Sequence, residues 1–185
     1  MFARKFLATL SAGVMLSFPL TTAPAQAAPR EALPIAAGPG DRIHGADISR
    51  WQHPGDKPIN FVKMHSAGLR FVMIKASDSR QDADRLSLKY LASDRKGAQE
   101  AGIYTGFYHY ALLPDVTTSS AIIKDATVQA QKVIWRLASL GGYNEMDLPY
   151  ALDLENNCVR YRSNKSCAKR ASKSAVTLWS KTFMS

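Results

Sequence analysis

Four short apolar runs, each followed by a segment that can form a helix, organise the chain from residue 43 onward. The runs are rich in β-branched and aromatic residues, as strands are, and they cover residues 43–49, 69–77, 103–110 and 149–155. Helices are predicted within 59–68, 87–102 and 125–142, and from 172 onward. Strands that alternate with helices are typical of β/α units and a parallel sheet.

The predicted helices carry apolar residues at helical spacing and end at glycines. In the second helix these are Leu88, Leu91 and Ala98, and in the third Ala126, Ala130, Val133, Ile134 and Leu137. Gly68, Gly102 and the pair at 141–142 provide the stops. Trp135 and Trp179 also lie on helical patterns, so we expect both in the core.

Acids and aromatics follow all four predicted strands. The strand ends contain Asp47 with Trp51, Lys75 with Asp78, Tyr108 with His109 and Tyr110, and Asp153 with Glu155. Functional groups in parallel β/α folds gather at the carboxyl ends of the strands. We therefore expect these side chains to form one site.

The pair Asp153 and Glu155 suggests a specific chemistry. Residues two apart on a strand point to one face, and two close carboxylates cannot both ionise freely, so one can stay protonated. A proton donor beside a carboxylate is what glycosidic cleavage needs. Trp51, Tyr108 and Tyr110 offer apolar faces to sugar rings.

Other interpretations of these residues stay open. The acid pair could hold Mg²⁺ or Ca²⁺, or could be a solvated strand end. Lys75 could pair with a carboxylate or extend to the rim. His109, between two tyrosines, is more typical of a structural histidine than of a catalytic base. The chain has no P-loop, dinucleotide-binding turn or GxSxG motif, and no cofactor or metal is expected.

The amino-terminal segment has the layout of an export signal. Residues 1–27 combine a basic start, an apolar stretch and Ala25-Gln26-Ala27, which predicts a secretory signal peptide and an extracellular protein. A membrane anchor is the alternative, but the apolar run is short and interrupted. Residues 28–42, rich in Ala, Pro and Gly, are predicted to be a flexible leader, and 43–185 the catalytic domain.

The charge of the chain is basic. Removing residues 1–27 takes away Arg4 and Lys5 and no acid, so the net charge falls from +9 to +7. Such a protein is attracted to polyanions, and anionic wall polymers or nucleic acid would satisfy the charge equally. The basic residues are scattered except between Arg160 and Lys173, and no zinc spacing or RNA-binding aromatic signature is present, so no nucleic-acid partner is expected.

Two cysteines, Cys158 and Cys167, lie nine residues apart in a polar segment after the fourth strand. In an exported chain this spacing favours a disulfide that closes a loop, and two free thiols are the alternative. A cysteine nucleophile is not expected, because no histidine is paired with either residue.

Taken in order, five motifs resemble the lysozymes of glycoside hydrolase family 25. They are GADISRWQ, FVMIKASD, GFYHY, Gln129-Ala130 and LPYALDLE, and the resemblance extends from residue 43 to about 185. It implies a distorted TIM-like β/α barrel and hydrolysis of the β-1,4 bond after N-acetylmuramic acid in bacterial peptidoglycan. It also implies Glu155 as the general acid, Asp153 as the group that stabilises the positive sugar centre, and Asp47 as the third acid of the cluster. Attack by the substrate's acetamido group and attack by water are both compatible with it.

Two features depart from the family pattern. The second motif reads KASDS where KATEG is usual, which leaves the role of Asp78 open. A complete barrel takes roughly 200 residues or more, so we expect only about four β/α units, a chain truncated at its C-terminus, and a monomer only if complete. The alternatives are a wall-binding module or inactive fragment, and a chitinase-like glycosidase.

Overall fold

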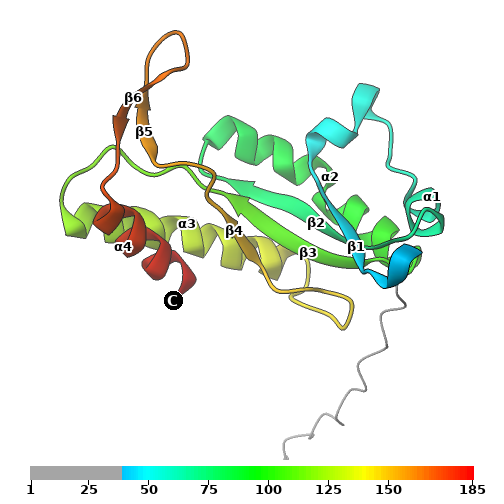
Figure 1. Ribbon diagram of the computed structural model, residues 1–185. Helices are drawn as coiled ribbons and strands as arrows, with labels where there is room; N and C mark the ends of the chain where they lie inside the picture. The colour runs from blue at the N-terminus through cyan, green and yellow to red at the C-terminus, as the bar shows by residue number, and fades with distance from the viewer. Residues whose placement is uncertain (1–38) are drawn as a thin grey trace, which may run out of the picture. The chain divides into compact units, whose positions relative to one another are not determined.

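The computed structural model describes residues 39–185. The predicted signal peptide (1–27) and most of the predicted leader (28–42) lie outside the described residues. The helices are α1 (Phe61–Ser66), α2 (Gln81–Glu100), α3 (Ser119–Ser139) and α4 (Lys173–Met184). The strands are β1 (His44–Ile48), β2 (Leu69–Asp78), β3 (Tyr104–Tyr110), β4 (Ala151–Asp153), β5 (Cys158–Tyr161) and β6 (Cys167–Arg170). Figure 1 follows this order by colour.

Strands β1 to β4 form one parallel sheet in the order β1-β2-β3-β4 (Figure 1). This confirms the parallel α/β fold and the four strands expected from the sequence. Within residues 39–185 the sheet is open, since β1 and β4 each pair with one neighbour in it. The closed barrel implied by the resemblance is therefore not formed by these residues.

The helices α1, α2 and α3 pack against a single face of this sheet. Buried residues of that face, such as Val72 and Phe107, form one core with Leu91 and Ala98 of α2. Each connection between neighbouring parallel strands is right-handed. Because the strands follow one another in chain order across the sheet, these connections place successive helices on the same face of the sheet. The opposite face of the sheet is consequently left without helices from the described residues.

A second core joins α4 to α3 and to the end of β4. Trp179 is fully buried there with Ala126 and Ile122, and Leu152 and Leu154 pack against the same cluster. Burial of Trp179 confirms the expectation. The prediction for Trp135 is wrong, since this side chain is 66% exposed. Ile134 and Leu88, predicted on apolar helix faces, are 57% and 41% exposed.

Helices α2 and α3 begin six residues earlier than their apolar pattern indicates. Helix α2 starts at Gln81, and α3 starts at Ser119, where the Thr118 side chain accepts a hydrogen bond from the Ala121 amide. Gly68 and Gly102 take positive φ values of 101° and 79° just after α1 and α2, as helix stops require. None of the helices within residues 39–185 is long and apolar enough to cross a membrane.

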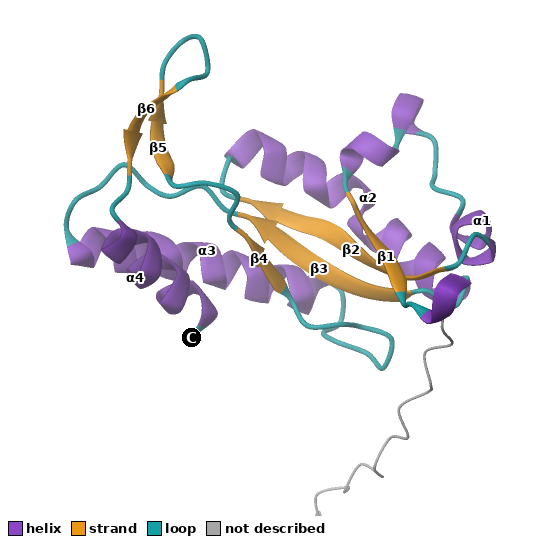
Figure 2. Cartoon of the chain, in the orientation of Figure 1, coloured by secondary structure: helices purple, strands orange, loops and turns teal. Residues whose placement is uncertain are grey.

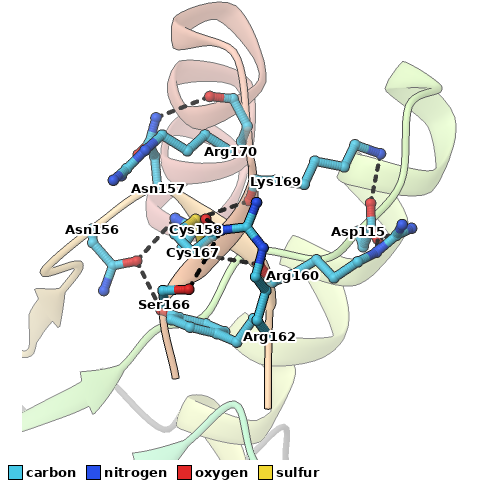
Figure 3. Close-up of a disulfide and its surroundings, with 12 residues drawn as sticks. Asp115, Asn156, Asn157, Cys158, Arg160, Arg162, Ser166, Cys167, Lys169 and Arg170 are labelled. Atoms are coloured by element: carbon cyan, nitrogen blue, oxygen red, sulfur yellow. Dashed lines mark hydrogen bonds and ion pairs between the residues drawn. A yellow bond between two sulfur atoms is a disulfide. The ribbon is translucent and has the colours of Figure 1, made fainter. Parts of the chain in front are cut away.

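The polar segment after β4 is an antiparallel hairpin of β5 and β6, where the sequence suggested a loop (Figure 2). Cys158 and Cys167 form a disulfide that joins the two strands, with a Cα–Cα distance of 5.8 Å. Two basic side chains, Arg160 and Lys169, also meet Asp115 from the segment between β3 and α3 (Figure 3). The hairpin is thus fixed both within itself and to the rest of the domain.

Candidate active site

A pocket of about 310 Å³ lies on the sheet face that the helices leave uncovered. It is lined by residues of β1, β2, β3 and β4 and by one residue just after β4, namely Asp47, Met73, Tyr108, Ala151, Asp153 and Glu155. The three acids that the sequence analysis selected as catalytic therefore lie around one pocket. They come from the two edges of the sheet, about 100 residues apart in the chain.

Strand register explains why these side chains share a face. Asp47 pairs with Met73 in adjacent strands, and Tyr108 pairs with Ala151. Partners in register point to the same side of a sheet. On β4, Leu152 and the following Leu154 pack into the core with α4, so Asp153 and Glu155 point to the opposite side.

Tyr110 links the acid after β4 to the end of β2. Its hydroxyl donates a hydrogen bond to Glu155 Oε2 at 3.2 Å. Two cations lie against its ring, with Lys75 Nζ 4.4 Å and Arg80 Cζ 4.9 Å from the ring centroid. Cations over an aromatic face are attracted by its quadrupole, so both residues restrain Tyr110.

Asp78 holds both of these cations. Its Oδ2 lies 2.6 Å from Lys75 Nζ and 2.9 Å from Arg80 Nη2, and its side chain is fully buried. Burial alone would raise the pKa of Asp78, but the hydrogen bonds from Arg80 and Lys75 outweigh it and lower that pKa to about 2. Asp78 is therefore an anion that organises the cations around Tyr110.

This arrangement clarifies two points of the sequence analysis. Lys75 is paired with a carboxylate, which was one of the two alternatives considered. Arg80 was not among the predicted site residues, although its position two residues after Asp78 in the turn following β2 allows such a contact. Met73 was also missed, and its alternation with the buried Val72 and Ile74 was the available signal.

The acidic pocket changes the protonation of its own members. The pKa of Asp153 is raised, first by burial and then by the negative charge of Glu155, with Lys75 opposing the shift. The pKa of Tyr108 is raised well above its ordinary value by burial and then by the charges of Asp47 and Asp153. The pocket therefore favours a proton on Asp153 more than water does.

Two other residues considered from the sequence lie away from the pocket lining. Trp51 is 74% exposed in the short 3-10 helix Arg50–Gln52, where the Arg50 guanidinium lies 4.1 Å from its ring centroid. His109 is fully buried on the helix-covered face and contacts Ser77 Oγ at 2.9 Å. Burial lowers the pKa of His109 to about 4, so it is neutral at physiological pH and serves the structure.

Metal ligation was an alternative for the acid pair. Across the described residues 39–185, no group of three or more His, Cys, Asp or Glu side chains has an arrangement that could hold a metal ion.

Comparison with known proteins identifies a family. The model of glycosyl hydrolases family 25 matches residues 46–185. The chain is 33% identical over 136 residues to Lysozyme M1 of Streptomyces globisporus, covering 66% of this chain and 39% of that protein. It is 31% identical over 115 residues to the uncharacterized protein YegX of Escherichia coli K12, covering 61% and 36%. The chain thus spans less than half the length of these curated relatives.

Two solved structures are also similar. One is the muramidase from Acremonium alcalophilum, with a TM-score of 0.53 and 30% identity over 77% of this chain and 58% of that one. The other is the lysozyme from Streptomyces coelicolor, with a TM-score of 0.50 and 26% identity over 76% and 55%. Both comparisons cover most of the domain that the structure describes.

Proposed function

The chain belongs to glycosyl hydrolase family 25, and on that premise we propose that it is a muramidase. The reaction is hydrolysis of the β-1,4 bond between N-acetylmuramic acid and N-acetylglucosamine in bacterial peptidoglycan, with a role in cell-wall catabolism. The observation that carries this proposal is the pocket lined by Asp47, Asp153 and Glu155. A chain of this family with three carboxylates around one pocket has the groups that glycosidic cleavage requires.

Each acid has a proposed role. Glu155 donates a proton to the oxygen of the leaving sugar. The hydrogen bond from Tyr110 holds its carboxyl group in one orientation. Asp153 in its ionised form stabilises the positive charge that develops at the sugar ring, so its raised pKa makes this contribution fade as the pH falls. Asp47, across the pocket, adds negative charge to the same centre.

Substrate binding is assigned to the aromatic and basic residues of the same face. Tyr108, in the pocket lining, and Tyr110 beside it offer ring faces to the sugars. Lys75 orders Tyr110 and adds positive charge close to the acids. Trp51 is a more distant contact, and its exposed ring is available to a neighbouring sugar of a long glycan strand.

The barrel expected from the sequence is part of the proposal. Helices α1 to α3 cover one face of the sheet, and the pocket lies on the other. In a TIM-like barrel the helices lie outside and the opposite face of the sheet turns inward. We therefore propose that the pocket face is the inner face of a distorted β/α barrel, and that a chain forming such a barrel acts as a monomer.

Cellular location follows from the substrate and the sequence. A muramidase acts outside the cytoplasm, and the signal-like residues 1–27 support export. The proposed partner is then the bacterial wall.

Product analysis tests this function. The chain is incubated with purified peptidoglycan and with chitin, and the new reducing ends are identified by mass spectrometry after reduction. We expect reducing N-acetylmuramic acid from peptidoglycan and no cleavage of chitin. Cleavage of chitin at a similar rate would indicate the chitinase-like alternative. Binding to peptidoglycan without any new reducing ends would indicate a binding module or an inactive fragment.

A further inference from the structure

The excess positive charge of the protein is concentrated in the part of the sequence that follows Glu155. Seven of the 24 Lys and Arg residues follow Glu155, and none of the 15 Asp and Glu residues does. Between residue 28 and Glu155 the basic and acidic residues are equal in number. Five of the seven lie in the hairpin of β5 and β6 and its turn, which we call the basic hairpin: Arg160, Arg162, Lys165, Lys169 and Arg170.

Two of these five cations contact a carboxylate of the domain, and Arg162 and Arg170 do not. Arg160 and Lys169 face each other across the hairpin, and Asp115 binds both at 2.7 Å, which relieves the repulsion between them. Arg162 instead donates to Ser166 Oγ and the Cys167 carbonyl, and Arg170 to Asn157 Oδ1 at 3.0 Å (Figure 3). These acceptors are neutral, so both guanidinium charges remain available to an anion.

The hairpin is a rigid platform close to the active site. The Cys158–Cys167 disulfide ties its strands, and the Ala171 amide donates to the Asn157 carbonyl at 2.8 Å at its base. The hairpin begins three residues after Glu155 and projects from the edge at which β2 and β3 end (Figure 2). Cations held in a preorganised frame bind an anion with less loss of side-chain freedom than flexible ones do.

We propose that the basic hairpin binds a phosphodiester polymer carried by the bacterial wall. Guanidinium groups match phosphate oxygens with two parallel hydrogen bonds, and two of the three cations without a neutralising carboxylate contact are arginines. A polymer attached to the glycan would meet the hairpin when the glycan enters the pocket. The charge of the hairpin predicts a phosphodiester polymer of any source, and nucleic acid presents similar phosphates. The choice of a wall polymer rests on the proposed muramidase function.

A matched pair of charge variants tests the proposal. The hairpin variant carries Arg162→Gln, Lys165→Gln and Arg170→Gln, which spare the two cations bound to Asp115. The control carries Lys57→Gln, Lys63→Gln and Lys124→Gln, which remove the same charge from exposed positions outside the hairpin. Binding of purified poly(glycerol phosphate) teichoic acid by the full chain is measured at several salt concentrations. If the hairpin variant does not unfold cooperatively, the variant with Arg162→Gln and Lys165→Gln alone replaces it.

We expect the hairpin variant to bind the polymer on the order of tenfold more weakly than the parent, with a smaller dependence on salt. The control variant should bind much as the parent does. Equal binding by parent and hairpin variant, or an equal loss in the control, would overturn the proposal. So would tighter binding of duplex DNA than of the polymer at equal phosphate concentration.

Hydrolysis provides a separate readout. On peptidoglycan stripped of its phosphodiester polymers, the hairpin variant should release reducing ends at the parental rate. If neither protein cleaves that substrate, the muramidase assignment fails while the polymer-binding result stands. A hairpin variant that cleaves stripped peptidoglycan slowly but binds the polymer normally would show that these residues contact the glycan itself, against the proposal.

Discussion

Replacing Asp78 with Asn removes the negative charge that holds Lys75 and Arg80 against Tyr110, and it keeps the size of the side chain. The amide oxygen can still accept the hydrogen bond that the Arg80 amide donates to Asp78 Oδ1 at 2.8 Å. The perturbation is thus confined to the two ion pairs. Because these contacts restrain the residue that binds Glu155, the change should affect both stability and catalysis.

The size of the stability effect follows from the pKa of Asp78, which falls from 3.8 to about 2 in the folded protein. Each tenfold change in proton affinity is worth ~1.4 kcal/mol, so the charged carboxylate stabilises the fold by roughly 2 kcal/mol. Since the folded pKa is the lower one, this stability is present above pH 3.8 and is lost as the pH falls toward 2.

Urea unfolding of the parent and of Asp78→Asn across this pH range is the assay. The variant should be less stable by roughly 2 kcal/mol at neutral pH, and the difference should shrink as the solution is acidified. Asp82→Asn is the matched control, because Asp82 pairs with Arg85 at a side chain that is 87% exposed, and such pairs contribute little. Equal stability of parent and Asp78→Asn at neutral pH, or a difference that persists unchanged at low pH, would refute the reasoning.

Three further changes probe the site and the hairpin. Tyr110→Phe keeps the ring under Lys75 but removes the donor to Glu155, so kcat should fall roughly tenfold with a small change in KM, as measured on soluble glycan. Asp153→Asn should abolish turnover yet raise the free energy of unfolding at neutral pH. The pKa of Asp153 is raised in the folded protein, so the parent loses stability as the pH rises through that pKa. Asn cannot ionise, so the variant avoids this loss. An unchanged or lower free energy of unfolding in the variant would contradict the reasoning. Replacing Cys158 and Cys167 with Ser should lower the unfolding free energy by about 2 to 3 kcal/mol in the chain-entropy model, and reductant should lower that of the parent alone.

The strands and the acidic face could be read from the sequence because both depend on local pattern. Alternation within LDLE separates Leu152 and Leu154 from Asp153 and Glu155, and the structure has the leucines in the core and the acids on the pocket. Parallel strands then bring Asp47 to the same pocket from the other edge. Periodicity and topology together therefore predicted that the three acids would meet, whereas Trp51 and His109, expected at the same site, lie away from the pocket.

Features that depend on tertiary contacts were not accessible in this way. Trp135 is two residues beyond the buried Val133, a rotation of about 200° around the helix, so it points to solvent although its neighbourhood is apolar. The role of Asp78 required the positions of Lys75, Arg80 and Tyr110 around one carboxylate.

The most direct test of the account is the release of reducing ends from purified peptidoglycan by the parent and by Glu155→Gln. Gln keeps the shape of the side chain and an oxygen that can accept the Tyr110 hydrogen bond, but it has no carboxyl proton to donate. We predict that the variant still binds peptidoglycan and unfolds like the parent but releases reducing N-acetylmuramic acid at least about 100-fold more slowly. Release at the parental rate by Glu155→Gln would contradict the assignment of the general acid and, with it, the proposed mechanism.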